Sequence, residues 1–223
     1  MKVDAVIVAA GASTRFGDQD KLLADLAGRP VVAWSLAAYE ACSSVERIIV
    51  VASSETMAAM ASLAHEWAPG KFTCVVAGGA RRRDSVEAGL RASRSRYVAV
   101  HDGARPLVTT AVIESCISAA ERRPGAIAAV PVTDTIKEVD EGMVDGHPDR
   151  TRLWAAQTPQ VILRQAWLDA AAAGDDDETD DAAMLSRLGL EVAVAAGDPE
   201  NIKITRPLDL EVARLILERR NSQ

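Results

Sequence analysis

A loop near the start of the chain combines small residues with two cations, which is the composition of a phosphate-binding turn. It begins with Ala9-Ala10-Gly11 and carries Arg15 and Lys21. Small residues let backbone N–H groups approach an anion, and the two cations would stand over it. The loop has neither the GxGxxG pattern of dinucleotide-binding turns nor the GK[ST] pattern of a P-loop. We therefore interpret it as a triphosphate site; the alternative is a tight turn whose cations are solvated.

A second loop, Gly78–Ser85, places two glycines and three arginines at the start of a predicted helix. Cations at the amino end of a helix oppose the helix dipole, so a bound anion would relieve the conflict. Asp84 relieves part of it, and the two glycines allow a flat ligand to come close to the backbone. The alternative is a plain surface loop.

Two further loops carry a carboxylate and cations. Asp102 and Arg105 directly follow an apolar strand. At that position a carboxylate can orient a metal ion or hydroxyl groups, and an arginine can pair bidentately with a phosphate. Lys203 lies in a short extended piece before a helix that begins with a proline. The alternatives are that Asp102 caps a turn and pairs with Arg105, and that Lys203 is solvated.

The elements around these loops place all four on one edge of a sheet. Apolar runs typical of buried parallel strands alternate with segments of helical length. Strands are expected at residues 3–9, 47–52, 72–76, 97–101, 126–132 and 191–195, and helices at 30–41, 54–67, 84–93, 110–122, 164–173, 182–188 and 208–220. This alternation predicts an α/β fold, a three-layer α/β/α sandwich around a mostly parallel, Rossmann-like sheet.

Ligands of such sheets bind at the carboxyl ends of the strands. There the four loops would form one cation-rich pocket, which suits two phosphorylated ligands. No Ser–His–Asp or Cys–His set offers a covalent nucleophile. None is needed if the nucleophile is a phosphate monoester, because its second pKa of about 6 leaves it ionised near neutral pH.

The regular pattern breaks between residues 133 and 158. Two short strand-like pieces, at 136–139 and 143–144, flank a turn, and a polar stretch follows at 145–152. Apolar side chains such as Ile136, Val139 and Trp154 would be left bare on a lone hairpin, which is marginal in water. We therefore expect an arm over about residues 133–155 that packs on a second copy of the chain. No linker divides the chain, so one domain over residues 1–223 is expected, and the acidic run at 174–181 is interpreted as a solvated loop.

Composition excludes several classes of function. The 223 residues carry a net charge of −7 and only 4% aromatic residues, which argues against nucleic-acid binding. The three cysteines are far apart and the histidines lack metal-ligand spacing, which excludes a disulfide scaffold and a thiolate zinc site. No apolar run is long enough for a membrane span, and the chain enters its first strand without a signal peptide. We expect a cytoplasmic protein.

Six motifs, taken in order, make the sequence resemble the 2-C-methyl-D-erythritol 4-phosphate cytidylyltransferases of the non-mevalonate isoprenoid pathway. They are VIVAAGASTRFG, GGARRRDSV, HDGARP, DTIKEV, LWAAQTPQ and NIKITRP, and they run essentially end to end. The resemblance implies a nucleotidyltransferase-type domain with a protruding β-arm, and CTP and a polyol phosphate as substrates. It also implies Mg²⁺ or another divalent cation as cofactor, and a homodimer whose arms complete shared active sites.

The same resemblance implies roles for individual residues. Arg15 and Lys21 match the family's stabilisers of the transition state, and Arg150 and Lys203 match the residues that position the methylerythritol phosphate. The positions that match substrate contacts are Asp102, Arg105, Thr135 and Thr158, and those that match cytidine and triphosphate contacts are Ala9, Ala10, Gly11, Gly78, Gly79, Arg82 and Ser85. Asp102 is also the candidate metal contact, through water. The chain departs from the family pattern at Lys21, which follows Asp20 where a proline is familiar and lies one residue nearer to Arg15 than in some members.

Other functions stay open at this point. Ribitol-5-phosphate cytidylyltransferases share most of these motifs, although Arg150 ahead of Leu153-Trp154 favours methylerythritol phosphate. A non-catalytic nucleotide-binding module could share the fold, although binding a nucleotide alone would not need Lys203 on the far side of the pocket. A Rossmann dehydrogenase is disfavoured, because the third glycine of its motif is missing.

Overall fold

The structure of the chain is a computed structural model that describes residues 1–11, 16, 20–174, 178 and 180–222. Arg15, which matches a stabiliser of the transition state, lies outside the described residues. Every other residue singled out above for a role in a site is described.

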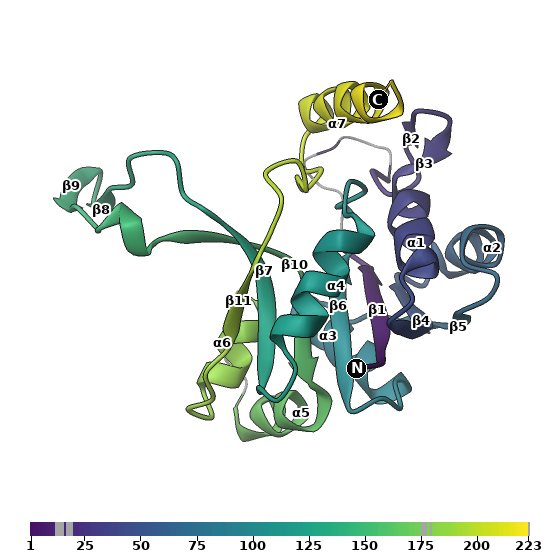
Figure 1. Ribbon diagram of the computed structural model, residues 1–223, viewed down its shortest axis with the longest axis horizontal. Coiled ribbons are helices and arrows are strands. Elements are labelled where there is room, and N and C mark those ends of the chain that lie inside the picture. Colours follow the sequence, from purple (N-terminus) through teal and green to yellow (C-terminus); the bar gives the residue numbers. More distant parts are fainter. Residues whose placement is uncertain (12–15, 17–19, 175–177, 179, 223) are drawn as a thin grey trace.

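A seven-stranded sheet forms the centre of the molecule (Figure 1). Its spatial order is β11-β7-β10-β6-β1-β4-β5, and every neighbouring pair is parallel except the two made by β10. The strands are β1 (Val3–Ala9), β4 (Val45–Ala52), β5 (Phe72–Ala77), β6 (Tyr97–Asp102), β7 (Gly125–Pro131), β10 (Trp154–Leu163) and β11 (Ala193–Ala196). In β1, Ala5 and Ile7 join the core on one face while Val6 joins the core on the other. Burial on both faces explains why the strand is a continuous apolar run.

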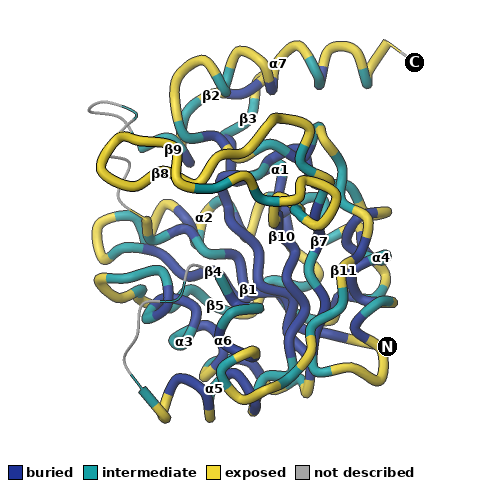
Figure 2. The backbone as a smooth tube through the Cα atoms, turned by 90° about the vertical axis from the view of Figure 1, so that its left-hand side faces the viewer, coloured by how far each residue is buried: buried dark blue, intermediate teal, exposed yellow. Residues whose placement is uncertain are grey.

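Helices cover both faces of this sheet, which confirms the predicted three-layer sandwich. The larger core lies between the sheet and α1 (Val31–Ala41), α2 (Met57–Trp67), α4 (Thr110–Ala119) and α7 (Pro207–Asn221). The smaller core lies between the sheet and α3 (Arg82–Ala92), α5 (Arg164–Ala173) and α6 (Asp181–Ser186). In Figure 2 the strands of the sheet are largely dark blue, while exposed residues lie on the outer sides of the helices.

Strand β10 begins within the stretch that the sequence predicted to be a polar connection up to residue 158, so that prediction is wrong for residues 154–158. The strand begins at Trp154 and lies antiparallel between β6 and β7. It escapes recognition because Gln157, Thr158 and Gln160 are polar, yet all three are buried and hydrogen-bonded. The other expected elements are present with shifted ends. The short hairpin of β2 (Asp25–Leu26) and β3 (Arg29–Pro30) was not expected.

The connection between β7 and β10 extends away from the body as an arm (Figure 1). It carries a small antiparallel sheet of β8 (Glu138–Asp140) and β9 (Met143–Gly146), followed by a 3-10 turn, η1 (Arg150–Arg152). The side chains at its tip are bare: Val139, Met143 and Val144 are 60%, 74% and 55% exposed. A hairpin of this size has little stability of its own in water.

Candidate active site

A cavity of about 250 Å³ opens at the carboxyl ends of β1 and β6, beside the turn that precedes α3. Its lining includes residues from all four loops identified in the sequence: Ala10, Gly11, Lys21, Gly79, Arg82, Ser85, Asp102 and Lys203. The described residues of the four loops therefore converge at the carboxyl ends of the strands, as expected.

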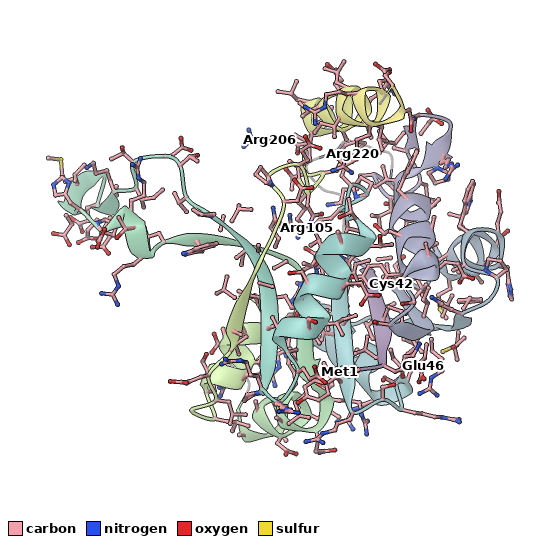
Figure 3. All side chains as sticks on the ribbon, viewed as in Figure 1. Met1, Cys42, Glu46, Arg105, Arg206 and Arg220 are labelled. Atoms are coloured by element: carbon pink, nitrogen blue, oxygen red, sulfur yellow. The ribbon has the colours of Figure 1, made fainter. Side chains whose placement is uncertain are left out.

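A second cavity, of about 280 Å³, lies beside the first. It is lined by Arg105 and Thr158, by the polar side chains of Gln157 and Gln160 from β10, and by Asp180. The two cavities share Arg82, Asp102 and Lys203 as lining residues. In Figure 3, Arg105 lies toward the end of the strands that is nearer to α7, and Met1 lies toward the opposite end. Two ligands held in these cavities would meet at the shared residues.

Asp102 is the centre of the charge network. Its Oδ2 atom lies 2.8 Å from Nζ of Lys203 and 3.9 Å from Nε of Arg105, and its Oδ1 atom lies 3.3 Å from Nε of Arg82. Burial by itself would raise the pKa of Asp102, but the charges of Arg82, Lys203 and Arg105 outweigh it and hold the pKa well below its usual range. The carboxylate therefore stays ionised near neutral pH. The pair with Arg105 that the sequence left open is present, but Lys203 and Arg82 lie nearer to the carboxylate.

Buried neighbours hold the two lysines in place. Ile204 is fully buried, and its N–H donates to the carbonyl of Ala104 at 2.8 Å, which ties the segment carrying Lys203 to the loop after β6. Leu22, next to Lys21, is 3% exposed. Each lysine thus projects from a backbone that is anchored one residue away.

The two glycines of the second loop allow it to pack against the first. A Cβ atom on Gly78 would lie 2.3 Å from Cβ of Ala10 and 2.7 Å from Oγ of Ser85, and one on Gly79 would lie 2.3 Å from Cβ of Asp84. Ser85 is buried, and its Oγ accepts from the N–H of Gly79 at 3.2 Å. Only glycine fits at these positions, and the cavity wall depends on the close approach.

The three arginines at the start of α3 make separate contacts; Arg81 precedes the helix, and Arg82 and Arg83 are its first two residues. Arg81 pairs with Asp84 at 2.8 Å, and Asp84 also accepts from the backbone N–H of Arg81. Arg83 is buried and donates from Nη2 to the carbonyl of Ala171 on α5. Arg82 is the member of the three that contacts Asp102. The conflict between cations and helix dipole is thus largely relieved within the protein.

Asp181 is a functional-site neighbour that the sequence analysis missed. It falls in the acidic run interpreted as a solvated loop, and that interpretation is wrong here, because Asp181 is 1% exposed. Its Oδ2 atom lies 2.9 Å from Nη2 of Arg82, and its Oδ1 accepts from Nε1 of Trp167 at 3.1 Å. Neighbouring acidic residues concealed its burial. The sequence signal that was available is the short apolar helix that begins at Asp181.

Comparison with known proteins identifies the family. The family model of 2-C-methyl-D-erythritol 4-phosphate cytidylyltransferase matches residues 3–219. The chain belongs to this family. Relatives of that name are 44% identical over 220 residues in Prochlorococcus marinus strain MIT 9313, covering 95% of this chain and 96% of that protein, and 43% identical over 224 residues in Symbiobacterium thermophilum, covering 97% and 93%.

Solved structures of cytidylyltransferases have the same fold. The 4-diphosphocytidyl-2C-methyl-D-erythritol synthase of Anaerococcus prevotii superposes with a TM-score of 0.86 at 27% identity, covering 97% of this chain and 98% of that one. The 2-C-methyl-D-erythritol 4-phosphate cytidylyltransferase of Thermus thermophilus superposes with a TM-score of 0.80 at 27% identity, covering 98% and 100%. The predicted fold type is confirmed, and so is the prediction of a nucleotidyltransferase enzyme.

Two residues matched to substrate contacts of the cytidylyltransferases, Thr135 and Arg150, lie on the arm. Both are exposed, and neither is among the described residues that line the two cavities. Nη1 of Arg150 donates to the carbonyl of Thr133 within the same arm. Ala9 and Gly78 do not line the first cavity themselves, but their sequence neighbours Ala10 and Gly79 do. The remaining matched residues that the structure describes line one cavity or both.

Two absences hold for the described ranges of the chain. No three side chains of the His, Cys, Asp or Glu type come together there in an arrangement that could hold a metal ion. None of the helices in these ranges combines the length and the apolar character needed to cross a membrane.

Proposed function

We propose that this protein transfers a cytidylyl group from CTP to 2-C-methyl-D-erythritol 4-phosphate. A phosphate oxygen of the acceptor forms a bond to the α-phosphorus of CTP, and the bond from that phosphorus to the bridging oxygen of the β-phosphate breaks, which releases pyrophosphate. The observation that carries this proposal is the pair of adjacent cavities with a shared set of cations. Family membership supports the identity of both substrates.

The nucleotide is assigned to the first cavity. Lys21 and Arg82 supply positive charge for the triphosphate, and the small residues Ala10, Gly11 and Gly79 expose backbone groups to the base. Backbone groups can read the edge of a pyrimidine through hydrogen bonds, and a close wall leaves little room for a purine. We expect CTP to be turned over well above ATP or GTP.

The acceptor phosphate is assigned to the second cavity, beside Lys203 and Arg105. The acceptor is already ionised near neutral pH, so the site needs no general base. Its tasks are to bring two polyanions together, to align them, and to hold the charge that develops in the transition state. Lys21, near the start of the chain, and Lys203, near its end, both line the first cavity. Their positive charges suit the stabilisation of the charge that develops in the transition state.

We propose Mg²⁺ or another divalent cation as cofactor. Asp102 is a carboxylate that lines both cavities, and Mg²⁺ is typically bound by one or two carboxylates together with substrate phosphates and waters. The donor set therefore fits an ion held mainly by the triphosphate. The two carboxylate oxygens of Asp102 already lie within 3.3 Å of the side-chain nitrogens of Arg82 and Lys203. A contact between Asp102 and the metal ion would therefore pass through water. When bound, the ion would neutralise part of the phosphate charge.

We also propose a homodimer with shared active sites. In a single chain, Thr135 and Arg150 lie on the extended arm and outside both cavities, so their proposed contact with substrate would be made in the partner's site. The bare apolar tip of the arm supports the same assembly, because packing against a second copy would cover it.

We propose the cytoplasm as the place of the reaction. Cys42, Cys74 and Cys116 are free thiols, which fit a reducing compartment.

A pyrophosphate-release assay over a panel of substrates tests the proposed function. CTP, ATP and GTP are each combined with 2-C-methyl-D-erythritol 4-phosphate or ribitol 5-phosphate, with Mg²⁺ and with chelator. We expect release with CTP and the methylerythritol phosphate in the presence of Mg²⁺. Equal turnover of ATP would contradict the assignment of the base, and faster reaction of ribitol phosphate would contradict that of the acceptor. No turnover with any pair would indicate a binding module.

A further inference from the structure

The guanidinium of Arg82 bridges two carboxylates that come from different parts of the fold. Nε lies 3.3 Å from Asp102, at the end of β6, and Nη2 lies 2.9 Å from Asp181, at the start of α6. Arg82 lines both cavities, whereas Asp181 is not among the described residues that line either. Asp181 therefore lies behind Arg82, and its carboxylate can affect a ligand through the guanidinium of that side chain.

Asp181 is itself held firmly. Its side chain accepts from Trp167 on α5, and its backbone N–H donates at 2.9 Å to Oε1 of Gln160, a residue of β10 that lines the second cavity. Burial raises the pKa of Asp181, and the charge of Arg82 opposes that rise. A carboxylate in such a place is costly unless it is paired, and the pairing with Arg82 compensates for its burial.

The bridge determines how much of Asp102 remains for other partners. A guanidinium has five N–H donors in one plane, so contacts at Nε and Nη2 fix its orientation without using all its donors. Without Asp181, Arg82 would have one carboxylate left and would be drawn onto Asp102, where it would compete with Lys203. The contact with Asp181 keeps Nη2 of Arg82 away from Asp102, so Nζ of Lys203 retains its contact with Oδ2 of Asp102 at 2.8 Å.

From this geometry we propose that Asp181 is a positioning residue for the transfer: it orients Arg82 toward the nucleotide and keeps Asp102 available to Lys203. The proposal rests on the proposed function for the identity of the ligand. It concerns binding geometry, however, and can be tested without turnover.

The test is a double-mutant cycle with CTP as the probe. Dissociation constants for CTP are measured by calorimetry on the full-length wild type, Asp181→Asn, Arg82→Ala and the double variant. We expect Asp181→Asn alone to weaken CTP binding roughly tenfold, in the middle of the range for residues that share one network. In the Arg82→Ala background the same change should alter binding less than about twofold. The proposal is overturned if the two substitutions act independently, so that their free-energy changes add and their fold-changes in the dissociation constant multiply in the double variant. It is also overturned if Asp181→Asn binds CTP as tightly as the wild type.

Two further variants separate positioning from folding. Trp167→Phe removes the other donor to Asp181 and leaves its contact with Arg82. It should lower the melting temperature while CTP affinity stays within about twofold of wild type. Arg82→Lys keeps the charge, but an ammonium lacks the planar fork that spans both carboxylates, so CTP binding should weaken. If Asp181→Asn does not fold, Asp181→Glu takes its place in the cycle, because it keeps a carboxylate but shifts it relative to Arg82, and its effect should likewise vanish in the Arg82→Ala background. Equal loss of affinity in Trp167→Phe, or wild-type affinity in Arg82→Lys, would contradict the proposal.

Failure of this inference is distinguishable from failure of the proposed function. If the wild type releases pyrophosphate from CTP and methylerythritol phosphate but the cycle is additive, Asp181 has no positioning role. If the wild type shows no turnover but the cycle shows coupling, the positioning role holds and the proposed reaction is wrong.

Discussion

The hydroxyl oxygen of Thr158 lies 2.9 Å from Nδ1 of His101, and the same oxygen accepts from the backbone N–H of Asp102 at 3.1 Å. This oxygen still has its own hydrogen to donate, and Nδ1 accepts it when the ring proton of His101 is on Nε2. Nε2 of His101 faces the carbonyl of Arg105 at 3.2 Å, and a carbonyl can only accept, so Nε2 carries the ring proton. Burial lowers the pKa of His101 to about 3, so the ring is neutral near neutral pH. Thr158 thus fixes the backbone from which Asp102 projects.

Replacing Thr158 by Val should therefore reduce both stability and activity. The change leaves the buried N–H of Asp102 and Nδ1 of His101 without partners, and we expect a loss of about 2 kcal/mol in the free energy of unfolding. Activity at a temperature where the variant is folded should fall as well, because Asp102 loses its fixed position. Thr158→Ser keeps the hydroxyl and is the matched control. Equal losses in both variants would show that the methyl group, not the hydroxyl, matters.

This role of Thr158 shows what the sequence alone could not reveal. The order of apolar runs was sufficient to predict the sandwich, and the four loops were sufficient to predict one cation-rich edge. Strand β10 was missed because burial of polar side chains depends on partners distant in the chain: Gln160 is satisfied by the backbone of Asp181, twenty-one residues away. Asp181 was missed for the same reason, since only the fold shows that Arg82 reaches it.

A second prediction concerns Asp4, which anchors the first strand. This fully buried carboxylate accepts from Oγ of Ser93, from the backbone N–H groups of Arg94 and Ser95, and from Nε of Arg47. Burial opposes ionisation, but these donors outweigh it and hold the pKa of Asp4 below its usual value. At neutral pH, Asp4→Asn should lower the free energy of unfolding by about 2 kcal/mol.

The pH dependence of that loss follows from the sign of the shift. A carboxyl whose pKa is lower in the folded than in the unfolded protein contributes its full stability well above the unfolded value of about 3.9, and loses it as pH falls through the folded value. The stability gap between wild type and Asp4→Asn should therefore be constant from pH 7 to about pH 5 and shrink below that. Denaturant unfolding of both proteins across this range checks it; a gap that widens in acid would contradict the prediction.

Lys21 should act mainly in the chemical step. It lines the first cavity beside an anchored residue, and its charge matters most when negative charge builds up around the α-phosphate. Lys21→Ala should lower kcat on the order of 10²-fold, by analogy with the loss of a preorganised oxyanion donor, and should raise KM for CTP much less. Steady-state kinetics at saturating acceptor measure both constants. A raised KM with unchanged kcat would make Lys21 a uniform binder of nucleotide.

The arm offers the sharpest test of the shared site. If Arg150 serves the partner's site while Lys21 serves its own, an Arg150→Ala chain and a Lys21→Ala chain each lack something that the other supplies. In a heterodimer of the two, one site holds both intact residues and the other holds both defects. Equal mixing gives heterodimers in half of the dimers, so about a quarter of all sites are whole. After unfolding and refolding together, the mixture should recover about a quarter of wild-type activity, although each parent alone is nearly inactive. Separate purification tags on the two chains would verify that heterodimers form. If verified heterodimers show no recovery, or if a fully active monomer sediments alone, each chain builds its own site and Arg150 acts within it.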